Sequence, residues 1–321
     1  MVHWQPGASR SVLELRARLA AAVREFFAAR GVLEVETPLL AQAGVSDVHL
    51  GSLTTRIAGR PAAYYLQTSP EYAMKRLLAA GSGDIYQLCK AFRDGEAGRQ
   101  HNPEFTLLEW YRLGFDHHQL MDEVEALLTR LLGARLHAPA ERLSYREAFL
   151  RELGIDPHTA PLEALAALAG ARLGAPADLA AEGRDALLDL LMGALVGPAL
   201  GAGRISFVHE YPASQAALAR LLPGTPAVAA RFEAYVGGLE LCNGFHELAD
   251  PAEQRARFRR DLEARAARGL PAVPIDERLL AALGAGLPDV AGVAVGFDRI
   301  VMLAAGVGDI AAAMAFTVDE A

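Results

Sequence analysis

The side chains best suited to chemistry in this sequence lie in residues 92–112. The segment predicts two strands joined by a loop that is rich in Arg, His and Asn. The second strand alternates, so that Glu109 and Tyr111 share one face while Leu108 and Trp110 share the other. A carboxylate and a phenol on one face, beside a loop arginine, suit a ligand that is both anionic and cationic.

Three segments of the chain resemble class II aminoacyl-tRNA synthetases of the lysyl type. Residues 92–106 contain Phe-Arg and His-Asn-Pro-Glu-Phe-Thr, which resemble motif 2 of that family. Residues 292–299, Gly-Val-Ala-Val-Gly-Phe-Asp-Arg, resemble motif 3. Residues 238–248, Gly-Leu-Glu-Leu-Cys-Asn-Gly-Phe-His-Glu-Leu, resemble the strand that binds metal and lysine in the lysyl enzymes. The motifs occur in the family's order, so the resemblance covers essentially the whole chain.

The resemblance implies an α+β fold, with an antiparallel sheet of six or seven strands flanked by helices. Residues 1–321 would form one class II synthetase-like catalytic domain, with an Ala/Leu/Gly-rich helical insertion at about 136–203 between motifs 2 and 3. Lysyl-tRNA synthetases carry a separate N-terminal barrel that reads the anticodon. This chain enters motif 1 almost at once, so no anticodon-binding domain is expected.

Apolar spacing predicts a helix over residues 11–30 that Gly31 ends, followed by a strand over 32–38. The pair resembles motif 1, which forms the dimer interface in the family, so the resemblance implies a homodimer. An ordinary core helix with an edge strand would give the same pattern. Other predicted elements are a hairpin of 48–57 with 62–67, a helix that Ser69 caps, a capping box at 144–147, a strand at 205–212 and a helix from Asp250 to Arg268.

Activation of a carboxylic acid by ATP brings a carboxylate to the α-phosphate, and two anions repel. Guanidinium groups and Mg²⁺ must offset that repulsion. The predicted catalytic residues are Arg93, which would bridge the α-phosphate and the substrate carboxylate, and Arg299, at the γ-phosphate. Phe105 and Arg299 would hold the adenine between them. The implied ATP contacts are Arg93, Asp94, Gly95, Glu96, His101, Asn102, Phe105, Glu240, Leu241, Gly296 and Arg299.

Glu233 and Glu240 are the predicted metal ligands, because Mg²⁺ prefers a few carboxylates together with phosphate oxygens and water. Seven residues apart on a straight strand, they would lie on opposite faces. Gly237 and Gly238 lie between them, and glycines inside a strand often mark a bulge or bend. We therefore predict a break that turns both carboxylates to one side. The alternative is an exposed acidic edge.

The predicted amino-acid pocket contains several carboxylates, with no basic residue assigned beside them. Uncompensated buried charge is costly, so the pocket needs a cationic ligand. A diamino acid supplies two ammonium groups, which favours lysine-like substrates over neutral ones. The implied substrate contacts are Ser69, Glu71, Glu109, Tyr111, Asn243, Glu247 and Ala294.

Two positions depart from the lysyl synthetase pattern. Those enzymes usually have a Glu two residues after the motif 2 arginine, which contacts the adenine amino group, whereas this chain has Gly95 followed by Glu96. Either Glu96 replaces it or backbone groups read the adenine. At position 294 the lysyl enzymes tend to have Gly, while truncated paralogues that lysylate elongation factor P resemble this chain in having Ala. Those paralogues favour a β-amino isomer of lysine, and one methyl group shifts selectivity by about 1–3 kcal/mol.

Composition limits where the protein works. Cys89 and Cys242 give neither a disulfide framework nor zinc spacing, which indicates a reducing compartment. The longest apolar run, around 187–200, is too short to span a bilayer, so a cytoplasmic protein without membrane association is expected. A net charge of −8 does not favour stable tRNA binding.

Three functional hypotheses follow. In the first, the chain uses ATP and Mg²⁺ to activate lysine or (R)-β-lysine as an adenylate and transfers it to a lysine side chain of elongation factor P. The second is a stand-alone ligase that acts on tRNA or a small-molecule amine. The third is a catalytically dead, synthetase-like regulator. The missing anticodon barrel disfavours the second, and retention of Arg93, Arg299, Glu233 and Glu240 disfavours the third.

Overall fold

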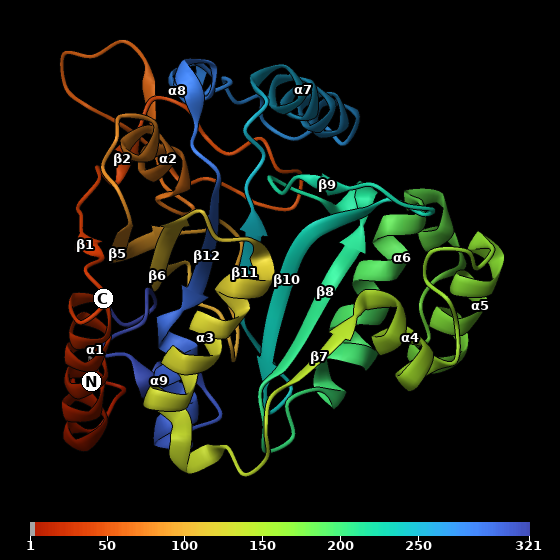
Figure 1. The fold of residues 1–321 in the computed structure, drawn as a ribbon, viewed down its shortest axis with the longest axis horizontal. Coiled ribbons are helices and arrows are strands. Elements are labelled where there is room, and N and C mark those ends of the chain that lie inside the picture. Colours follow the sequence, from red (N-terminus) through yellow and green to blue (C-terminus); the bar gives the residue numbers. More distant parts are fainter. Residues whose placement is uncertain (1–3) are drawn as a thin grey trace.

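The segments around motifs 2 and 3 come together in one large sheet (Figure 1). The computed structural model describes residues 4–321, with only the backbone at 177–178. Within these residues the sheet has nine strands, and its main path runs β1-β5-β6-β12-β11-β10-β8-β7, with β9 paired to β10. The strands are β1 (Leu33–Glu34), β5 (Ile85–Phe92), β6 (Glu104–Leu113), β7 (Glu141–Ser144), β8 (Ser206–Pro212), β9 (Leu221–Leu222), β10 (Val228–Val236), β11 (Leu239–His246) and β12 (Val290–Gly296).

The predicted α+β fold is confirmed, with two additions at the sheet edges. The six strands from β5 to β8 along the path pair antiparallel. At the edges, β1 runs parallel to β5 and β7 runs parallel to β8. The strand predicted over 32–38 is shorter than expected, because only Leu33 and Glu34 pair with β5.

One face of the sheet packs against α1 (Arg10–Ala28), α3 (His117–Leu132) and α9 (Phe297–Ala305). Leu108 and Trp110 of β6 are fully buried in this core, together with Val293 and Val295 of β12. Strand alternation therefore directs the neighbouring residues of β6 and β12 to the opposite face. That opposite face carries the site.

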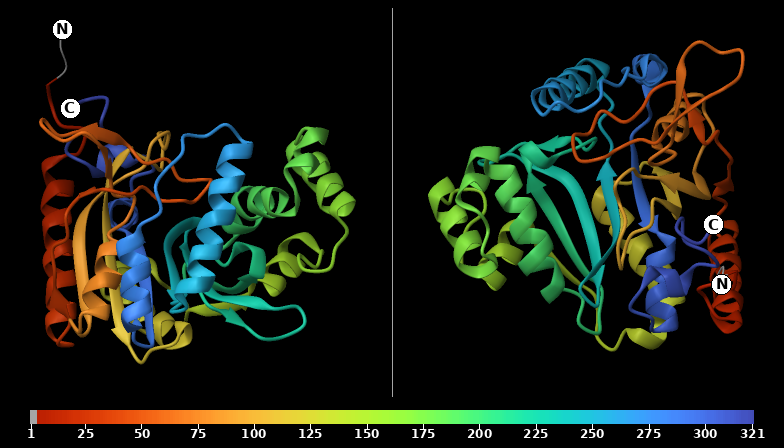
Figure 2. Two further views of the ribbon diagram at one scale, coloured as in Figure 1. Left: turned by 90° about the horizontal axis from the view of Figure 1, so that it is seen from above. Right: turned by 180° about the vertical axis from the view of Figure 1, so that it is seen from behind.

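Two further groups of elements border the site face. A small sheet of β2 (Leu40–Ala41), β3 (Thr54–Arg56) and β4 (Ala63–Leu66) contains the predicted hairpin, and α2 (Glu71–Ala79), α7 (Pro251–Ala267) and α8 (Glu277–Gly286) lie beside it. At the other end of the large sheet from α1, the helices α4 (Tyr145–Leu153), α5 (Leu162–Leu173) and α6 (Arg184–Leu191) form a separate core against β8 and β10 (Figures 1 and 2). Short 3-10 or π turns occur at 133–135, 177–182, 192–196, 197–199, 213–215 and 310–313.

Local capping agrees with the sequence at two helices and differs at a third. The Ser144 capping box is present, and Asp250 caps α7 with Pro251 at its first position. For α2, the N-cap is Pro70 and not Ser69; the Ser69 hydroxyl accepts a hydrogen bond from the Glu71 N–H at 3.2 Å, one residue inside the helix. Among the described residues, no helix combines the length and the apolar character needed to cross a membrane.

Candidate active site

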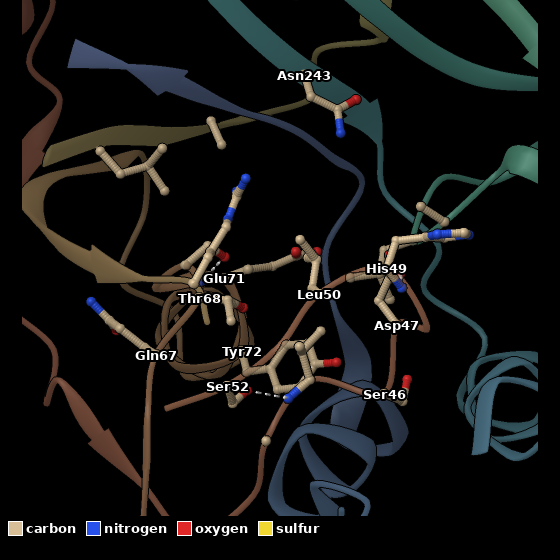
Figure 3. Close-up of a pocket in the computed structure, with 18 of the residues that line it drawn as sticks. Ser46, Asp47, His49, Leu50, Ser52, Gln67, Thr68, Glu71, Tyr72 and Asn243 are labelled. Atoms are coloured by element: carbon tan, nitrogen blue, oxygen red, sulfur yellow. Dashed lines mark hydrogen bonds between the residues drawn. The ribbon is translucent and has the colours of Figure 1, made fainter. Parts of the chain in front are cut away.

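A cavity of about 1310 Å³ lies on the site face of the large sheet. Figure 3 shows Asn243 reaching into it from the sheet, across from Glu71, with the loop of Asp47, His49 and Leu50 along another side. Of the predicted site residues, those that line it are Ser69, Glu71, Arg93, Glu96, His101, Asn102, Phe105, Glu240, Leu241, Asn243, Ala294, Gly296 and Arg299.

Strand register places the centre of the site in one cross-strand row. Glu109 of β6 is paired with Ala294 of β12, Ala294 with Asn243 of β11, and Asn243 with Glu233 of β10. Paired residues of neighbouring strands point to the same face, so these four side chains lie side by side. The row joins the predicted amino-acid pocket to the predicted metal ligands.

The predicted amino-acid pocket, called the amino-acid end of the site below, contains a buried cation that the sequence analysis missed. Lys75 is 1% exposed, and its Nζ lies 2.6 Å from a carboxylate oxygen of Glu71 and 2.6 Å from one of Glu247. Burial alone would lower the pKa of Lys75, but the Glu247 and Glu71 carboxylates outweigh it and raise that pKa. The expectation of a pocket without a basic residue was therefore wrong. The i, i+4 spacing of Glu71 and Lys75 on one helix was the signal that predicts this pair.

Glu109 and Tyr111 complete the amino-acid end, although they are buried behind the cavity wall. The Tyr111 hydroxyl donates to a Glu109 oxygen at 2.7 Å, and the other Glu109 oxygen is buried without a partner. Burial raises the pKa of Glu109 to about 8, and the nearby Glu71 carboxylate adds to the rise. Burial also raises the pKa of Glu247 to about 8, although Lys75 opposes the rise. When all three carboxylates ionise, Lys75 neutralises one charge and two negative charges remain.

Gly292 makes room for this arrangement. It is paired with Tyr111 across β12 and β6. A Cβ atom at Gly292 would lie 2.2 Å from the Tyr111 ring and 2.8 Å from a Glu247 oxygen. The tyrosine ring can thus lie across the neighbouring strand only because position 292 carries no side chain.

The phosphate end is built from the motif 2 loop and the start of α9. The Arg299 guanidinium donates to the Glu240 carbonyl at 2.7 Å and contacts the His101 ring nitrogen at 2.6 Å. Burial lowers the pKa of His101, and Arg299 lowers it further. The Arg93 guanidinium lies 5.0 Å from the Phe105 ring centre, and its Nε is buried without a hydrogen-bond partner. The two arginines therefore border the same part of the cavity.

Within the loop, the predicted ATP residues have different local roles. Gly95 has a φ of 78°, a conformation that favours glycine, so the chain turns there and Glu96 reaches Arg93 at 3.6 Å. Asp94 is bridged through its backbone to Gly51. The buried Asn102 side chain donates to the Glu104 carbonyl and accepts from the Val318 N–H.

The buried carboxylate of Asp298 connects the segments that resemble motifs 1, 2 and 3, next to Arg299. Asp298, directly before Arg299, accepts from the Thr106 N–H at 2.6 Å and pairs with Arg16 of α1 at 2.5 Å. Arg16 also donates to the Thr106 hydroxyl at 2.7 Å. Because Thr106 follows Phe105, this network fixes the spacing of Phe105 and Arg299.

The predicted metal ligands do face one side, but for a different reason than expected. Gly237 and Gly238 have φ values of 61° and 74° and form the two-residue turn that joins β10 to β11. Glu233 and Glu240 thus lie on neighbouring strands of a hairpin and not along one bent strand. Glu240 is paired with Tyr235, whose hydroxyl donates to Glu233, so both carboxylates share a face.

Burial raises the pKa of Glu240 to about 7, and the Glu233 carboxylate contributes to that rise. A cation between the two carboxylates would relieve their repulsion, so the pair fits a divalent metal. Within residues 4–321, no cluster of three or more His, Cys, Asp or Glu side chains is arranged to hold a metal by itself. A metal ion at this pair would take its remaining ligands from phosphate and water.

The sheet topology and the paired charge sites define a catalytic domain of the class II aminoacyl-tRNA synthetase type. Residues 1–320 match the family of tRNA synthetases class II (D, K and N), and the chain belongs to this family. An elongation factor P–(R)-beta-lysine ligase of Salmonella typhi is 53% identical over 323 residues, which cover 99% of this chain and 98% of the relative. The protein of the same name from Erwinia tasmaniensis is 54% identical over the same shares of both chains.

Proposed function

We propose that this protein uses ATP to activate lysine or (R)-β-lysine and transfers the aminoacyl group to a lysine side chain of elongation factor P. The observation that carries the substrate class is the charge of the buried pocket. Glu71, Glu109 and Glu247 face a single Lys75, and a diamino acid supplies two ammonium groups for the two remaining charges. The names and the identity of the relatives support elongation factor P as the acceptor.

The two ends of the cavity orient the substrate for the first step. Ammonium groups bind at the carboxylate end, which directs the substrate carboxylate towards Arg93. A carboxylate oxygen then attacks the α-phosphorus of ATP, the bond to the bridging oxygen breaks, and pyrophosphate leaves. Arg93 and Arg299 stabilise the charge that develops on the phosphates, because guanidinium donors match phosphate oxygens.

Glu233 and Glu240 would hold a divalent metal ion, and we propose Mg²⁺ because carboxylates, phosphate oxygens and water are its preferred ligands. When bound, the ion neutralises phosphate charge. The remaining residues of the phosphate end act on the nucleotide itself. We place the adenine between Phe105 and Arg299, because both side chains line the cavity and Arg299 contacts the His101 ring.

In the second step the amine of the acceptor lysine attacks the carbonyl carbon of the adenylate. An amide forms, AMP leaves, and the amine loses a proton. A lysine amine is mostly protonated at pH 7, so the released phosphate oxygens or nearby carboxylates must accept that proton. A substrate that takes part in translation places this reaction in the cytoplasm.

The test has two stages. ATP–pyrophosphate exchange with α-lysine, (R)-β-lysine, ornithine and leucine should show exchange with the diamino acids and none with leucine. Intact-mass analysis of elongation factor P after incubation should then show addition of one aminoacyl group, and lysine tRNA should not be charged. Robust tRNA charging without modification of the factor would overturn the acceptor assignment.

We also propose a homodimer through α1 and β1. Leu33 on the edge strand β1 of the large sheet is 55% exposed, and an apolar side chain exposed at a sheet edge supports an interface between copies. Leu39 and Leu40, at β2 of the small sheet, are 37% and 39% exposed. Sedimentation velocity should give the mass of a dimer, and Leu33→Glu should shift it to a monomer. A monomer for the parent protein would refute the proposal.

A further inference from the structure

Arg231 of β10 lies beside the Asn243 and Glu233 end of the row and lines the cavity, although no sequence motif pointed to it. Its side chain is 17% exposed. It donates from Nε to the Asn243 side-chain oxygen at 3.0 Å, from Nη1 to the Gln215 carbonyl at 2.7 Å and from Nη2 to Glu233 at 2.6 Å. The guanidinium also lies 4.4 Å from the Tyr211 ring centre. One planar group therefore contacts residues of β8, β10 and β11 and of the turn at 213–215.

The contact with Asn243 determines which way that amide points. A guanidinium has five donors and no acceptor, so Asn243 must present its oxygen to Arg231. Its NH₂ group is then directed into the cavity, as Figure 3 shows. Without Arg231 the amide would be free to rotate and offer an oxygen to the ligand. Arg231 thus holds Asn243 as a donor.

The contact with Glu233 acts on the other end of the row. Glu233 and Glu240 share a face, and Arg231 supplies the positive charge that balances them. One Glu233 oxygen accepts from Arg231 and the other accepts from Tyr235. A metal ion that binds Glu233 must therefore compete with a charged hydrogen bond already made by the protein.

We propose that Arg231 is a positioning residue that acts in opposite directions on the two ligands. It strengthens amino-acid binding by fixing the Asn243 amide, and it weakens metal binding to Glu233 and Glu240 until the phosphates of ATP add their own ligands. The part of this proposal that concerns amino-acid binding (the amino-acid half) rests on the proposed function. The part that concerns metal binding (the metal half) rests only on the carboxylates Glu233 and Glu240 and their contact with Arg231.

The test compares Arg231→Met with the parent protein in two binding measurements. Mn²⁺ binding without nucleotide, followed by electron paramagnetic resonance, should become at least about 5-fold tighter because a competing charge is lost. The Kd for lysine, measured by calorimetry, should rise about 10-fold or more, the range expected when one charge-assisted contact is removed. Effects of opposite sign cannot come from a general loss of folded protein, and a thermal melt of each variant checks the fold.

Four companion variants separate the two halves. Arg231→Lys keeps the positive charge but loses the planar set of donors that contacts Asn243 and Glu233 together. Mn²⁺ binding should therefore stay within about 2-fold of the parent while lysine binding weakens. Asn243→Ala should weaken only lysine binding, and Tyr235→Phe should change only Mn²⁺ binding. Arg255→Met, which removes an exposed pair with Glu277, should change neither.

Unchanged or weaker Mn²⁺ binding in Arg231→Met would overturn the metal half. An unchanged Kd for lysine in that variant would overturn the amino-acid half. If the parent itself binds no diamino acid, the proposed function fails, and the Mn²⁺ comparison still decides whether Arg231 opposes the metal.

Discussion

At the amino-acid end of the cavity, the charged groups come from strands and the first turns of α2, and they are almost fully buried. At the phosphate end, the arginines come from a loop and the start of a helix. Lys75 and Glu247 have side chains that are 2% and 1% exposed, whereas the Arg93 side chain is 27% exposed. The first set is held by β-sheet register and by a buried ion pair. The arginines of the phosphate end are held by contacts with neighbouring side chains, and a bound nucleotide would replace those contacts.

This difference indicates how the two ends discriminate. In the proposed reaction, the buried carboxylates cannot move away from a wrong ligand, so we expect a substrate without ammonium groups to leave Glu109 protonated and to gain no ion pair from it. Arg93 can change partners at low cost, because among residues 4–321 its guanidinium contacts Glu96 and the Phe105 ring and no other side chain that pairs with it. We therefore expect the phosphate end to adapt to a nucleotide as it passes from ATP to AMP.

The largest expected effect is at the phosphate end. Arg93→Ala or Glu240→Ala should reduce ATP–pyrophosphate exchange by about 10²–10³-fold or more, because each removes a charged partner from the transition state. Thermal melts should show that both variants remain folded. Arg99→Ala is the matched control in the same loop, because the Arg99 guanidinium makes a single hydrogen bond within residues 4–321, to the Gly308 carbonyl at 3.3 Å. Exchange within a few-fold of the parent would exclude these residues from the phosphate and metal set.

A smaller effect is expected at the buried end. Glu109→Gln keeps the shape of the side chain and removes one charge, so the KM for lysine should rise about 10–100-fold, as expected for a lost charged contact. The KM for ATP should change by less than 3-fold, which is roughly the scatter of such effects. Glu104→Gln is the control on the same strand, since the Glu104 side chain is half-exposed and, in the described part of the chain, forms one ion pair, with Lys90. Equal rises in the KM for lysine and the KM for ATP would contradict an amino-acid end that binds its ligand separately from the phosphate end.

The raised pKa of Glu109 predicts a pH dependence of amino-acid binding. Burial raises this pKa to about 8, above the ordinary 4.5, so Glu109 is largely protonated at pH 7 before the substrate binds, whereas Glu247 is paired with Lys75. A substrate ammonium group that pairs with Glu109 needs this carboxylate ionised. The KM for lysine should therefore fall by about 10-fold per pH unit for each proton released as the pH rises from 6 towards 8.

The same pKa shift predicts the sign of a stability change. Between pH 4.5 and 8 the folded protein holds more protons on Glu109 than the unfolded chain does, so the contribution of Glu109 to stability falls as the pH rises. Saturating lysine should oppose that fall. Calorimetry in buffers of different ionisation enthalpy measures the protons released, and a KM that is flat from pH 6 to 8.5 would refute the assignment.

Alternation and register explain how much of the buried end the sequence predicted. The period of two in β6 placed Glu109 and Tyr111 on one face, and Leu108 and Trp110 in the core, as found. Lys75 was missed because it lies on α2 and not on the strand whose alternation was used, and the helix sequence alone does not show that its ammonium is buried. Only the fold brings Glu247, 172 positions away, to the other side of its ammonium.

The metal end shows a different limit. The two glycines were correctly identified as a change of direction, but the sequence did not distinguish a bend within one strand from a hairpin between two. The positive φ angles of both glycines are those of a two-residue hairpin turn and not of a bend within one strand. Arg231 was missed for a related reason, because its partners Asn243 and Gln215 lie on a neighbouring strand and a loop. Short motifs predict what the local chain contributes, and not which distant residue holds it in place.

The smallest expected effect tests the boundary between the two ends, at Ala294. This residue lies in the row between Glu109 and Asn243, is half-buried and lines the cavity. If its methyl group excludes the α-amino position, Ala294→Gly should raise kcat/KM for α-lysine relative to (R)-β-lysine by about 10-fold, the lower end for one methyl group. If Ala294 only packs the sheet, glycine should cost about 1 kcal/mol of stability and leave that ratio unchanged. Measuring kcat/KM for both isomers, with the Tm of each protein, separates the two outcomes. An unchanged ratio would mean that the methyl group of Ala294 does not set the preference between the two lysine isomers, and that the backbone position of β12 sets it instead.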